Sequence, residues 1–421
     1  PRADMTKPPP LRDDCFAMPR GVEWTPVDVA LDRLRSSLTR VVGTTQIKTD
    51  VALGRVLATD VLAVCDHPPF ANAAVDGYGF AIADIPQADE ISLPLVDGRA
   101  AAGQAYDGVV PAGYAARILT GAAVPKGVDT IILQEDVNVD ATHIYFRKGL
   151  KVGANTRPQG EDIQAGQIIL SAGHKLRPAD LGVLASAGVS QIVVFDQLRV
   201  AVLATGAELV DAGSVKSHGQ IYDANRPMLL AQIAAWGYTP VDIGILPDDA
   251  DVIAAALDQA TQTADVVLTT GGASAGDEDH ISKLLSEKAN LQTWRIAVKP
   301  GRPLALAVWN GVPVFGLPGN PVAAMVCTHI FARPACGVLS GQGWLQTSAI
   351  SVPAAFSKNK KHGRSEYLRA RLNAQGHAEV FASEGSGRIS GLSWADGLIE
   401  LGHGGQNISH GDMVRYVPLV G

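Results

Sequence analysis

Residues 265–280, DVVLTTGGASAGDEDH, constrain the fold of this chain more than any other stretch. An apolar β-branched run leads into three glycines and then into a group of carboxylates. Such a run predicts a buried parallel strand, and open α/β sheets bind ligands at the carboxyl ends of such strands. Glycines there let backbone N–H groups approach an oxyanion, and nearby carboxylates indicate a bridging divalent cation. We therefore predict an anion site here, with a simple tight turn as the alternative.

Strand and helix patterns alternate on both sides of this stretch. The runs RVAVLATG and YTPVDIGIL predict strands, and residues 225–237, with Pro near the start and Gly at the end, predict a helix. Asp248 is expected to cap a further helix. The other expected elements are a helix around 281–285, a strand over 294–298, a hairpin turned at Asn310-Gly311 and a helix over 322–331. The alternation predicts a three-layer, doubly wound α/β domain.

The rest of the chain has different patterns. A helix is expected from Trp24, with Thr25 as its N-cap and its end near Gly43, and a second one over 178–188. Short β runs between these helices predict an all-β insertion, and similar runs near the C-terminus predict a β-barrel. The predicted domains are a disordered tail (1–22), a split linking domain (23–46 and 165–197), an inserted β domain (47–164), the α/β domain (198–341) and a C-terminal β-barrel (342–421).

Composition disfavours several classes of protein. The net charge of −7 argues against a general nucleic-acid or anionic-membrane binder. No apolar run reaches the roughly 18 residues of a membrane span, and the start of the chain has no signal-peptide core. The four cysteines show no CxxC spacing, so neither a disulfide framework nor a zinc site is indicated. A reducing cytoplasm is the simplest compartment.

Acidic residues from three separate segments are expected at the strand ends of the α/β domain. Glu208, Asp248 and Asp279 are predicted to share a Mg²⁺ ion, which takes few protein ligands and keeps water. The alternative is that Glu208 and Asp248 are only helix caps.

A basic group accompanies these carboxylates. Arg295 and Lys299 lie four residues apart on a predicted strand, hence on one face, and Arg302 follows a Pro-Gly turn. They are expected to line an oxyanion pocket, with solvated surface cations as the alternative. The basic run 358–364 is interpreted as a solvated loop, with Arg364 as a candidate ligand contact.

The β insertion carries its own polar candidates. Asp76 follows a run of small residues, where a carboxylate is costly unless it is paired or functional. Thr120 and Asp162 lie next to glycines, although turn chemistry alone explains Asp162. The sequence shows no Ser-His-Asp or Cys-His arrangement, so a protein nucleophile is not expected.

Eight segments in this order resemble the MoeA family, the molybdopterin molybdenumtransferases of molybdenum-cofactor biosynthesis. They are NAAVDGY, RILTGAAVP, RPQGEDI, LATGAEL, GQIYDANR, TTGGASAGDEDH, IAVKPGRP and GLPGNPV. The resemblance extends from Trp24 to the end and implies an elongated four-domain subunit in a homodimer. It also implies Mg²⁺-dependent insertion of molybdenum from molybdate into adenylylated molybdopterin, with release of AMP.

The resemblance assigns roles to individual residues. Glu208, Asp248 and Asp279 would serve the cation and the nucleotide. Asp76, Thr120 and Asp162 would complete the cleft from the partner subunit. The residues expected to bind molybdate, pterin or phosphate are Gly271, Gly272, Ser274, Gly276, Arg295, Lys299, Arg302, Pro318, Gly319, Asn320, Pro321, Arg364 and Ser386.

Two other functions stay open at this point. One is adenylylation of molybdopterin, by a related α/β fold with a similar TTGG loop; the additional domains argue against it. The other is a non-catalytic dimeric scaffold, like the gephyrin relative, and the retained Asp76, Asp248 and Asp279 argue against that. Arg302 stands where the family often has Lys, which changes the shape of that cation. Molybdate and tungstate are not distinguished, and the adenylyltransferase and molybdoenzyme maturation proteins are the protein partners considered.

Overall fold

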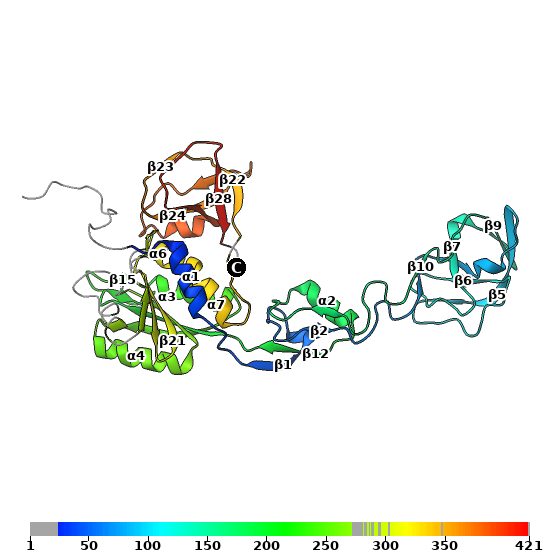
Figure 1. Cartoon of the computed structure of the whole chain (residues 1–421), viewed down its shortest axis with the longest axis horizontal. Coiled ribbons are helices and arrows are strands. Elements are labelled where there is room, and N and C mark those ends of the chain that lie inside the picture. The colour runs from blue at the N-terminus through cyan, green and yellow to red at the C-terminus, as the bar shows by residue number, and fades with distance from the viewer. Residues whose placement is uncertain are drawn as a thin grey trace, which may run out of the picture. The chain divides into compact units, whose positions relative to one another are not determined.

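The computed structural model describes residues 24–419, except 272–280, 282–283, 286, 288–289, 294–295, 302–303 and 347. The predicted tail therefore lies outside the described residues. The chain forms two compact units (Figure 1). Residues 43–195 make up the second unit, and the first unit combines the chain before and after them. The chain is thus a multidomain protein that combines an α/β part with parts built mainly from β-strands.

A six-stranded sheet in the order β16-β13-β17-β21-β20-β18 organises the first unit. Its first four strands are parallel, and β20 runs antiparallel to both its neighbours. Apolar side chains of β13, β17 and helix α4 share one core. The elements are β13 (Arg199–Thr205), α3 (Asn225–Ala235), β16 (Thr239–Leu246), α4 (Ala250–Thr263), β17 (Val266–Thr270), β18 (Asn290–Thr293), β20 (Ala305–Trp309) and β21 (Val312–Leu317), with the short strands β14 (Leu209–Val210) and β15 (Ile221–Tyr222) between β13 and α3.

The alternating pattern of this sheet is confirmed, with two corrections. The β20–β21 hairpin turns at Asn310 and Gly311, both at positive φ (48° and 82°), as a right-twisted two-residue turn requires. Of the strand predicted over 294–298, residues 294–295 lie outside the described residues. Its last residue belongs to β19 (Val298–Lys299), which joins the C-terminal sheet, and β18 is the edge strand of the α/β sheet instead. Asp249 caps α4, not Asp248.

A helical segment from Pro321 to Leu339 follows β21 and exceeds the predicted 322–331. It consists of α6 (Pro321–Cys327), the π-helical turn η4 (Thr328–Ala332) and α7 (Arg333–Leu339). Contrary to the sequence-based expectation, these 19 residues have the length and hydropathy of a membrane span. The most apolar part of this segment is 78% buried inside the protein, as in the core helix of a globular domain.

The first helix, α1 (Val27–Ser37), packs against α7 in the first unit. Its N-cap is Pro26 rather than the predicted Thr25, which instead forms a bridge with Ile296, and it ends well before Gly43. The sequence grouped residues 23–46 with 165–197, whereas this helix clusters with the α/β sheet and the C-terminal strands.

The C-terminal part of the first unit is a sheet in the order β19-β24-β26-β28-β22, and β25 additionally pairs with the end of β24. A bridge between Ala354 and Ala378 brings the end of β22 to β25. The elements are β22 (Ile350–Pro353), β23 (Lys358–Lys360), β24 (Ser365–Leu372), β25 (Ala378–Val380), α8 (Ser390–Trp394), β26 (Gly397–Leu401), β27 (Gln406–Ile408) and β28 (Met413–Pro418).

The second unit contains a six-stranded sheet, β7-β4-β6-β5-β9-β8, and three two-stranded ladders. The predicted helix near 178 is confirmed as α2 (Pro178–Ser186), with Gly188 at φ 76° just after its end. Thr44 of β1 pairs with Phe195 of β12, so the chain enters and leaves this unit on adjacent strands. The elements before β5 are β1 (Thr44–Lys48), η1 (Thr49–Val51), β2 (Val61–Leu62), β3 (Asn72–Ala73), β4 (Gly77–Phe80) and η2 (Ile82–Asp84). The later ones besides α2 are β5 (Glu90–Ala100), β6 (Ala115–Ile118), β7 (Thr130–Leu133), η3 (Gln134–Asp136), β8 (Asn138–Val139), β9 (His143–Arg147), β10 (Thr156–Arg157), β11 (Ile168–Leu170) and β12 (Gln191–Phe195).

Candidate functional site

The carboxyl ends of four parallel strands meet at one edge of the first unit's sheet. Thr205 at the end of β13 pairs with Leu246 of β16, and Thr270 at the end of β17 pairs with Leu317 of β21. The loops that follow carry most of the predicted ligand-binding residues. This edge is where open parallel sheets place their ligands.

Asn225 joins three of the segments at this edge. Its side chain is buried, and its Nδ2 donates to Thr270 Oγ1 (2.6 Å) and to the carbonyl of Gly319 (2.7 Å). Its backbone N–H donates to Asp223 Oδ1 (3.0 Å) at the start of α3. One amide thereby fixes the ends of β17 and β21 relative to α3.

The backbone after β17 approaches the end of β13 so closely that only glycine fits. Gly271 has φ 87°, and a Cβ at this position would lie 2.1 Å from the carbonyl oxygen of Thr205. Three buried polar atoms at this edge have no hydrogen-bond partner in the described part of the chain: Thr205 Oγ1, Thr269 Oγ1 and Asn225 Oδ1. Buried polar groups without partners are rare and indicate a polar ligand or ordered water.

Two of the three predicted cation ligands lie on adjoining loops of this edge. Asp248 Oδ2 accepts a hydrogen bond from the backbone N–H of Ala207 (3.0 Å), so Asp248 ties the loop after β16 to the loop after β13. The Glu208 carboxylate folds back over Gly206, since a Cβ there would lie 2.6 Å from Glu208 Oε2. Neither residue is a helix cap in the structure.

Several predicted residues fall outside the described part of the chain: Gly272, Ser274, Gly276, Asp279, Arg295 and Arg302. Among the described residues, no group of three or more His, Cys, Asp or Glu side chains has the geometry of a metal site. Glu208 and Asp248 nevertheless offer hard carboxylate oxygens of the kind that Mg²⁺ binds.

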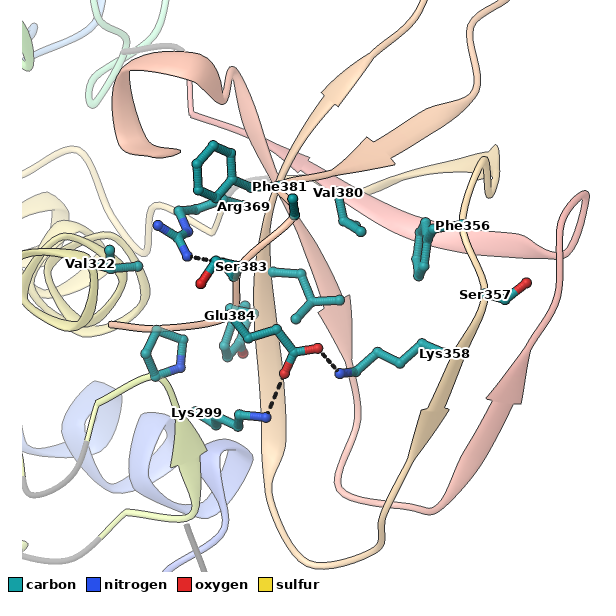
Figure 2. A pocket seen from close by; sticks show the side chains of 14 residues that line it. Lys299, Val322, Phe356, Ser357, Lys358, Arg369, Val380, Phe381, Ser383 and Glu384 are labelled. Carbon is teal, nitrogen blue, oxygen red and sulfur yellow. Dashed lines mark hydrogen bonds and ion pairs between the residues drawn. The ribbon is translucent and has the colours of Figure 1, made fainter. Parts of the chain in front are cut away.

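A pocket of about 220 Å³ lies between β19, the first turn of α6 and the C-terminal strands (Figure 2). Lys299 is one of its lining residues. The amino group of Lys299 lies 2.7 Å from Glu384 Oε2, and Lys358 contacts Glu384 Oε1 (Figure 2). Glu366 Oε2 is 3.2 Å from Lys358 and 3.6 Å from Lys299.

The interpretation of residues 358–364 as a solvated loop is wrong for two of its lysines. The Lys358 side chain is only 13% exposed and faces the pocket. Lys360 is buried, and its Nζ donates to the carbonyls of Lys361 and Gly404 (2.9 Å each). Burial lowers the pKa of Lys360. Arg364, just before β24, is half-buried and acts electrostatically on Lys360.

Ionic contacts hold the pocket charges in their ionised forms. Burial favours protonation of Glu384, but hydrogen bonds from Lys299 and Lys358 outweigh it and lower the pKa of this carboxyl. Burial likewise opposes the charge of Lys358, while Glu384 and Glu366 raise its pKa. At neutral pH the pocket therefore holds paired charges of both signs.

The Pro318–Pro321 turn connects this pocket to the strand-end edge. Val322, just after the turn, lines the pocket and donates its N–H to the carbonyl of Ser386 (3.2 Å). The loop around Ser386 is held by Arg369, whose guanidinium contacts the carbonyls of Ser383, Gly385 and Arg388 and lies over the ring of Phe381. The predicted turn and Ser386 are therefore brought together.

The second unit carries a separate acidic site. Asp76 Oδ1 accepts from both the backbone N–H and the hydroxyl of Thr120 (2.7 Å each), so these two predicted residues are in direct contact. The Thr120 hydrogen bonds, assisted by the charge of Arg117, lower the pKa of Asp76 and keep it ionised. Asp162 lies in a different turn, where its N–H donates to the carbonyl of His67 (3.1 Å).

Sequence reasoning missed Lys358 and Glu384 as members of these sites, and it considered Asn225, Glu366 and Arg369 only as parts of longer segments. Asn225 stood within the quoted segment GQIYDANR and at the start of the helix predicted over 225–237. The charged residues of the pocket have no local pattern, because their partners come from distant strands.

The fold is that of a multidomain α/β protein whose polar groups gather at the carboxyl ends of its parallel strands. Residues 25–188 match the MoeA N-terminal region (domain I and II), 201–337 a probable molybdopterin binding domain, and 351–419 the MoeA C-terminal region (domain IV). The chain belongs to the MoeA family.

Individual relatives and solved structures agree with this placement. A molybdopterin molybdenumtransferase of Haemophilus influenzae is 34% identical over 93% of this chain and 98% of its own length. Another, from Nostoc sp., is 31% identical over 86% of this chain and 80% of its own length. The structure of a molybdopterin biosynthesis MoeA protein from Pyrococcus horikoshii has a TM-score of 0.82 and 28% identity, covering 94% of this chain and all of that one.

Proposed function

We propose that this chain is a molybdopterin molybdenumtransferase, which inserts molybdenum from molybdate into adenylylated molybdopterin and releases AMP. Family membership and the names of its relatives support this activity. The structural observation that supports this activity is that the Pro318–Pro321 turn joins the strand-end edge to the pocket lined by Lys299. The polar strand-end edge suits phosphate and pterin, and the adjoining lysine pocket suits an oxyanion.

The strand-end edge would bind the nucleotide and phosphate end of the substrate. The buried Thr205, Thr269 and Asn225 side-chain oxygens, which have no hydrogen-bond partner among the described residues, would provide polar contacts. Gly272, Ser274 and Gly276 are proposed to bind the same phosphate end of the substrate. Splitting a phosphoanhydride needs positioning and charge neutralisation more than a protein nucleophile.

Mg²⁺ is proposed as the cation of this edge, held by Glu208, Asp248 and Asp279. The adjoining loops that carry Glu208 and Asp248 fit such a role because both present carboxylate oxygens beside the strand ends. When bound, Mg²⁺ would neutralise negative charge on the phosphate oxygens.

Molybdate and the pterin phosphate are proposed to bind next to the pocket. Lys299 lines the pocket together with Lys358 and Arg369. The Pro318–Pro321 turn leads into Val322, which lines the pocket and donates its N–H to the carbonyl of Ser386. Arg295, Arg302 and Arg364 are proposed to add positive charge.

We further propose a cytoplasmic homodimer with the domain boundaries given above. In this dimer, Asp76, Thr120 and Asp162 of one subunit complete the cleft formed by the α/β domain of the other. The contact between Asp76 and Thr120 supports a common role for these two residues.

The direct test incubates the purified full-length chain with adenylylated molybdopterin, Mg²⁺ and molybdate and measures AMP. We expect AMP release that depends on molybdate and on Mg²⁺. AMP release independent of molybdate, or turnover of ATP alone, would show that the proposal is wrong and favour adenylylation.

A test in cells separates catalysis from a scaffold role. Asp76→Ala and Asp279→Ala variants should fail to restore molybdoenzyme activity in a strain that lacks its own molybdenumtransferase, while the unchanged chain restores it. Equal complementation by all three would point to a scaffold.

A further inference from the structure

The carboxylate of Glu384 lies between two lysine amino groups in the pocket of Figure 2. Each of its oxygens contacts one of them: Oε2 lies 2.7 Å from Lys299, and Oε1 contacts Lys358. A tetrahedral oxyanion offers the same chemistry, with negative oxygens that accept charge-assisted hydrogen bonds from ammonium groups. Glu384 therefore occupies a position that such an anion would take between these lysines.

Glu384 supplies one of the two carboxylates that contact Lys299 and Lys358. Lys299 and Lys358 are 14% and 13% exposed, and Glu366 (10% exposed) is the second carboxylate near them. If Glu384 rotates away, Lys299 and Lys358 lose one of these two carboxylate contacts, and the positive charge of Lys360 nearby adds to theirs. Uncompensated buried charge is costly, so this state favours uptake of an external anion.

Of the two carboxylates, Glu384 has the freedom to move. Glu366 is buried within strand β24 and paired in the sheet with β26. Glu384 lies in the loop between β25 and α8, and its side chain is 43% exposed. Arg369 holds the backbone on either side of it through the carbonyls of Ser383 and Gly385. A side-chain rotation, without movement of the loop, is enough to release both lysines.

We propose that Lys358 is a second cation of the oxyanion subsite and that Glu384 is a built-in counter-ion that competes with a tetrahedral dianion for Lys299 and Lys358. The ligand class follows from the two-lysine geometry. Its identification as molybdate rests on the proposed function. Glu384 thereby pairs with both lysines before the anion arrives, and the anion must displace this carboxylate in order to bind.

The test measures equilibrium binding of molybdate to the full-length chain by isothermal titration calorimetry, without pterin substrate. Replacing Glu384 with Gln removes the competing charge, and we expect the dissociation constant to fall roughly tenfold. Lys358→Gln is expected to raise it by roughly the same factor, because one of the two donors is lost. Glu379→Gln is the matched control, since Glu379 is a carboxylate of β25 that pairs with Arg371 and does not line the pocket. It should leave the dissociation constant for molybdate unchanged.

Unchanged or weaker molybdate binding by folded Glu384→Gln would overturn the proposal and make Glu384 a positioning residue for Lys299. Glu384→Ala provides a second variant without a competing amide, and it should also tighten binding. Absence of molybdate binding by every form would overturn the proposal as well. These outcomes are separate from the AMP assay: if AMP release is independent of molybdate while Glu384→Gln still tightens binding, the proposed reaction fails and the counter-ion role stands.

Discussion

At the scale of single residues, the strand-end edge depends on one position where a side chain cannot fit. Gly271 combines a left-handed backbone with a hypothetical Cβ 2.1 Å from the Thr205 carbonyl oxygen. Gly271→Ala therefore adds backbone strain of about 1–2 kcal/mol and forces the loop away from β13. We expect molybdate-dependent AMP release to fall at least about tenfold, because catalytic geometry tolerates little displacement.

The control for this prediction is Gly213→Ala in the same unit. Gly213 has a similar φ of 88°, but a Cβ there meets nothing within 4 Å. It should lower the urea midpoint modestly through strain alone and leave AMP release near that of the unchanged chain. Equal losses of activity in both variants would mean that the close approach to Thr205 has no role of its own.

The sequence predicted the strand-end residues better than the pocket, for a physical reason. Glycine and turn chemistry are local, so the loop at Gly271 and the turn at Asn310-Gly311 could be predicted from neighbouring residues. Lys358 is paired with Glu366 of the next strand and with Glu384 of a later loop. These contacts depend on the tertiary fold, and the basic residues adjacent to Lys358 in sequence instead favoured a solvated loop.

At the scale of elements, the strongest alternation was predictable and the short strands were not. Apolar runs bounded by Pro and Gly identified β13, α3, β16 and β17. The two-residue β19 is too short to show a period, and its partner is β24 rather than the neighbouring strands of the α/β sheet. The adjacent residues Asp248 and Asp249 are equivalent as N-cap candidates by composition, and only packing shows that Asp249 caps α4.

Helix α2 offers an element-scale prediction, because one buried carboxylate holds its first turn. Asp180 Oδ2 accepts from the backbone N–H of Arg177 and pairs with His174 Nε2, each at 2.7 Å. Asp180→Asn removes the charge from these contacts. Solvent screens the largely exposed Arg177 side chain, so we expect a loss of about 1–2 kcal/mol in the free energy of unfolding at pH 7.

The pH dependence of this effect has a defined sign. Hydrogen bonds from Arg177, opposed by burial and aided by His174, lower the pKa of Asp180 below its ordinary value of 3.8. A lowered folded-state pKa stabilises the fold above the unfolded-state value, and this contribution is lost as pH falls through the folded-state pKa. Urea unfolding should therefore show a constant deficit for Asp180→Asn from pH 7 to about pH 5, which disappears only below pH 3.8. The exposed Asp50→Asn in the same unit should show no deficit at any of these pH values.

At the scale of the whole molecule, the candidate residues are divided between two units. Asp76 and Thr120 belong to the second unit, and Glu208, Asp248 and Lys299 to the first. The proposed homodimer places residues of one subunit's second unit with residues of the other subunit's first unit. This arrangement can be tested without a structure of the dimer.

Mixed dimers of two inactive variants test the shared cleft. In a dimer of Asp76→Asn and Lys299→Ala subunits, a cleft shared between subunits combines the intact first unit of one with the intact second unit of the other. One of the two clefts is then fully intact, and the other carries both changes. Random mixing makes half of the dimers mixed, so co-refolded protein should recover about a quarter of the AMP release of the unchanged chain. If each cleft were built from a single subunit, every cleft would carry one change, and the mixture would stay as inactive as either variant alone.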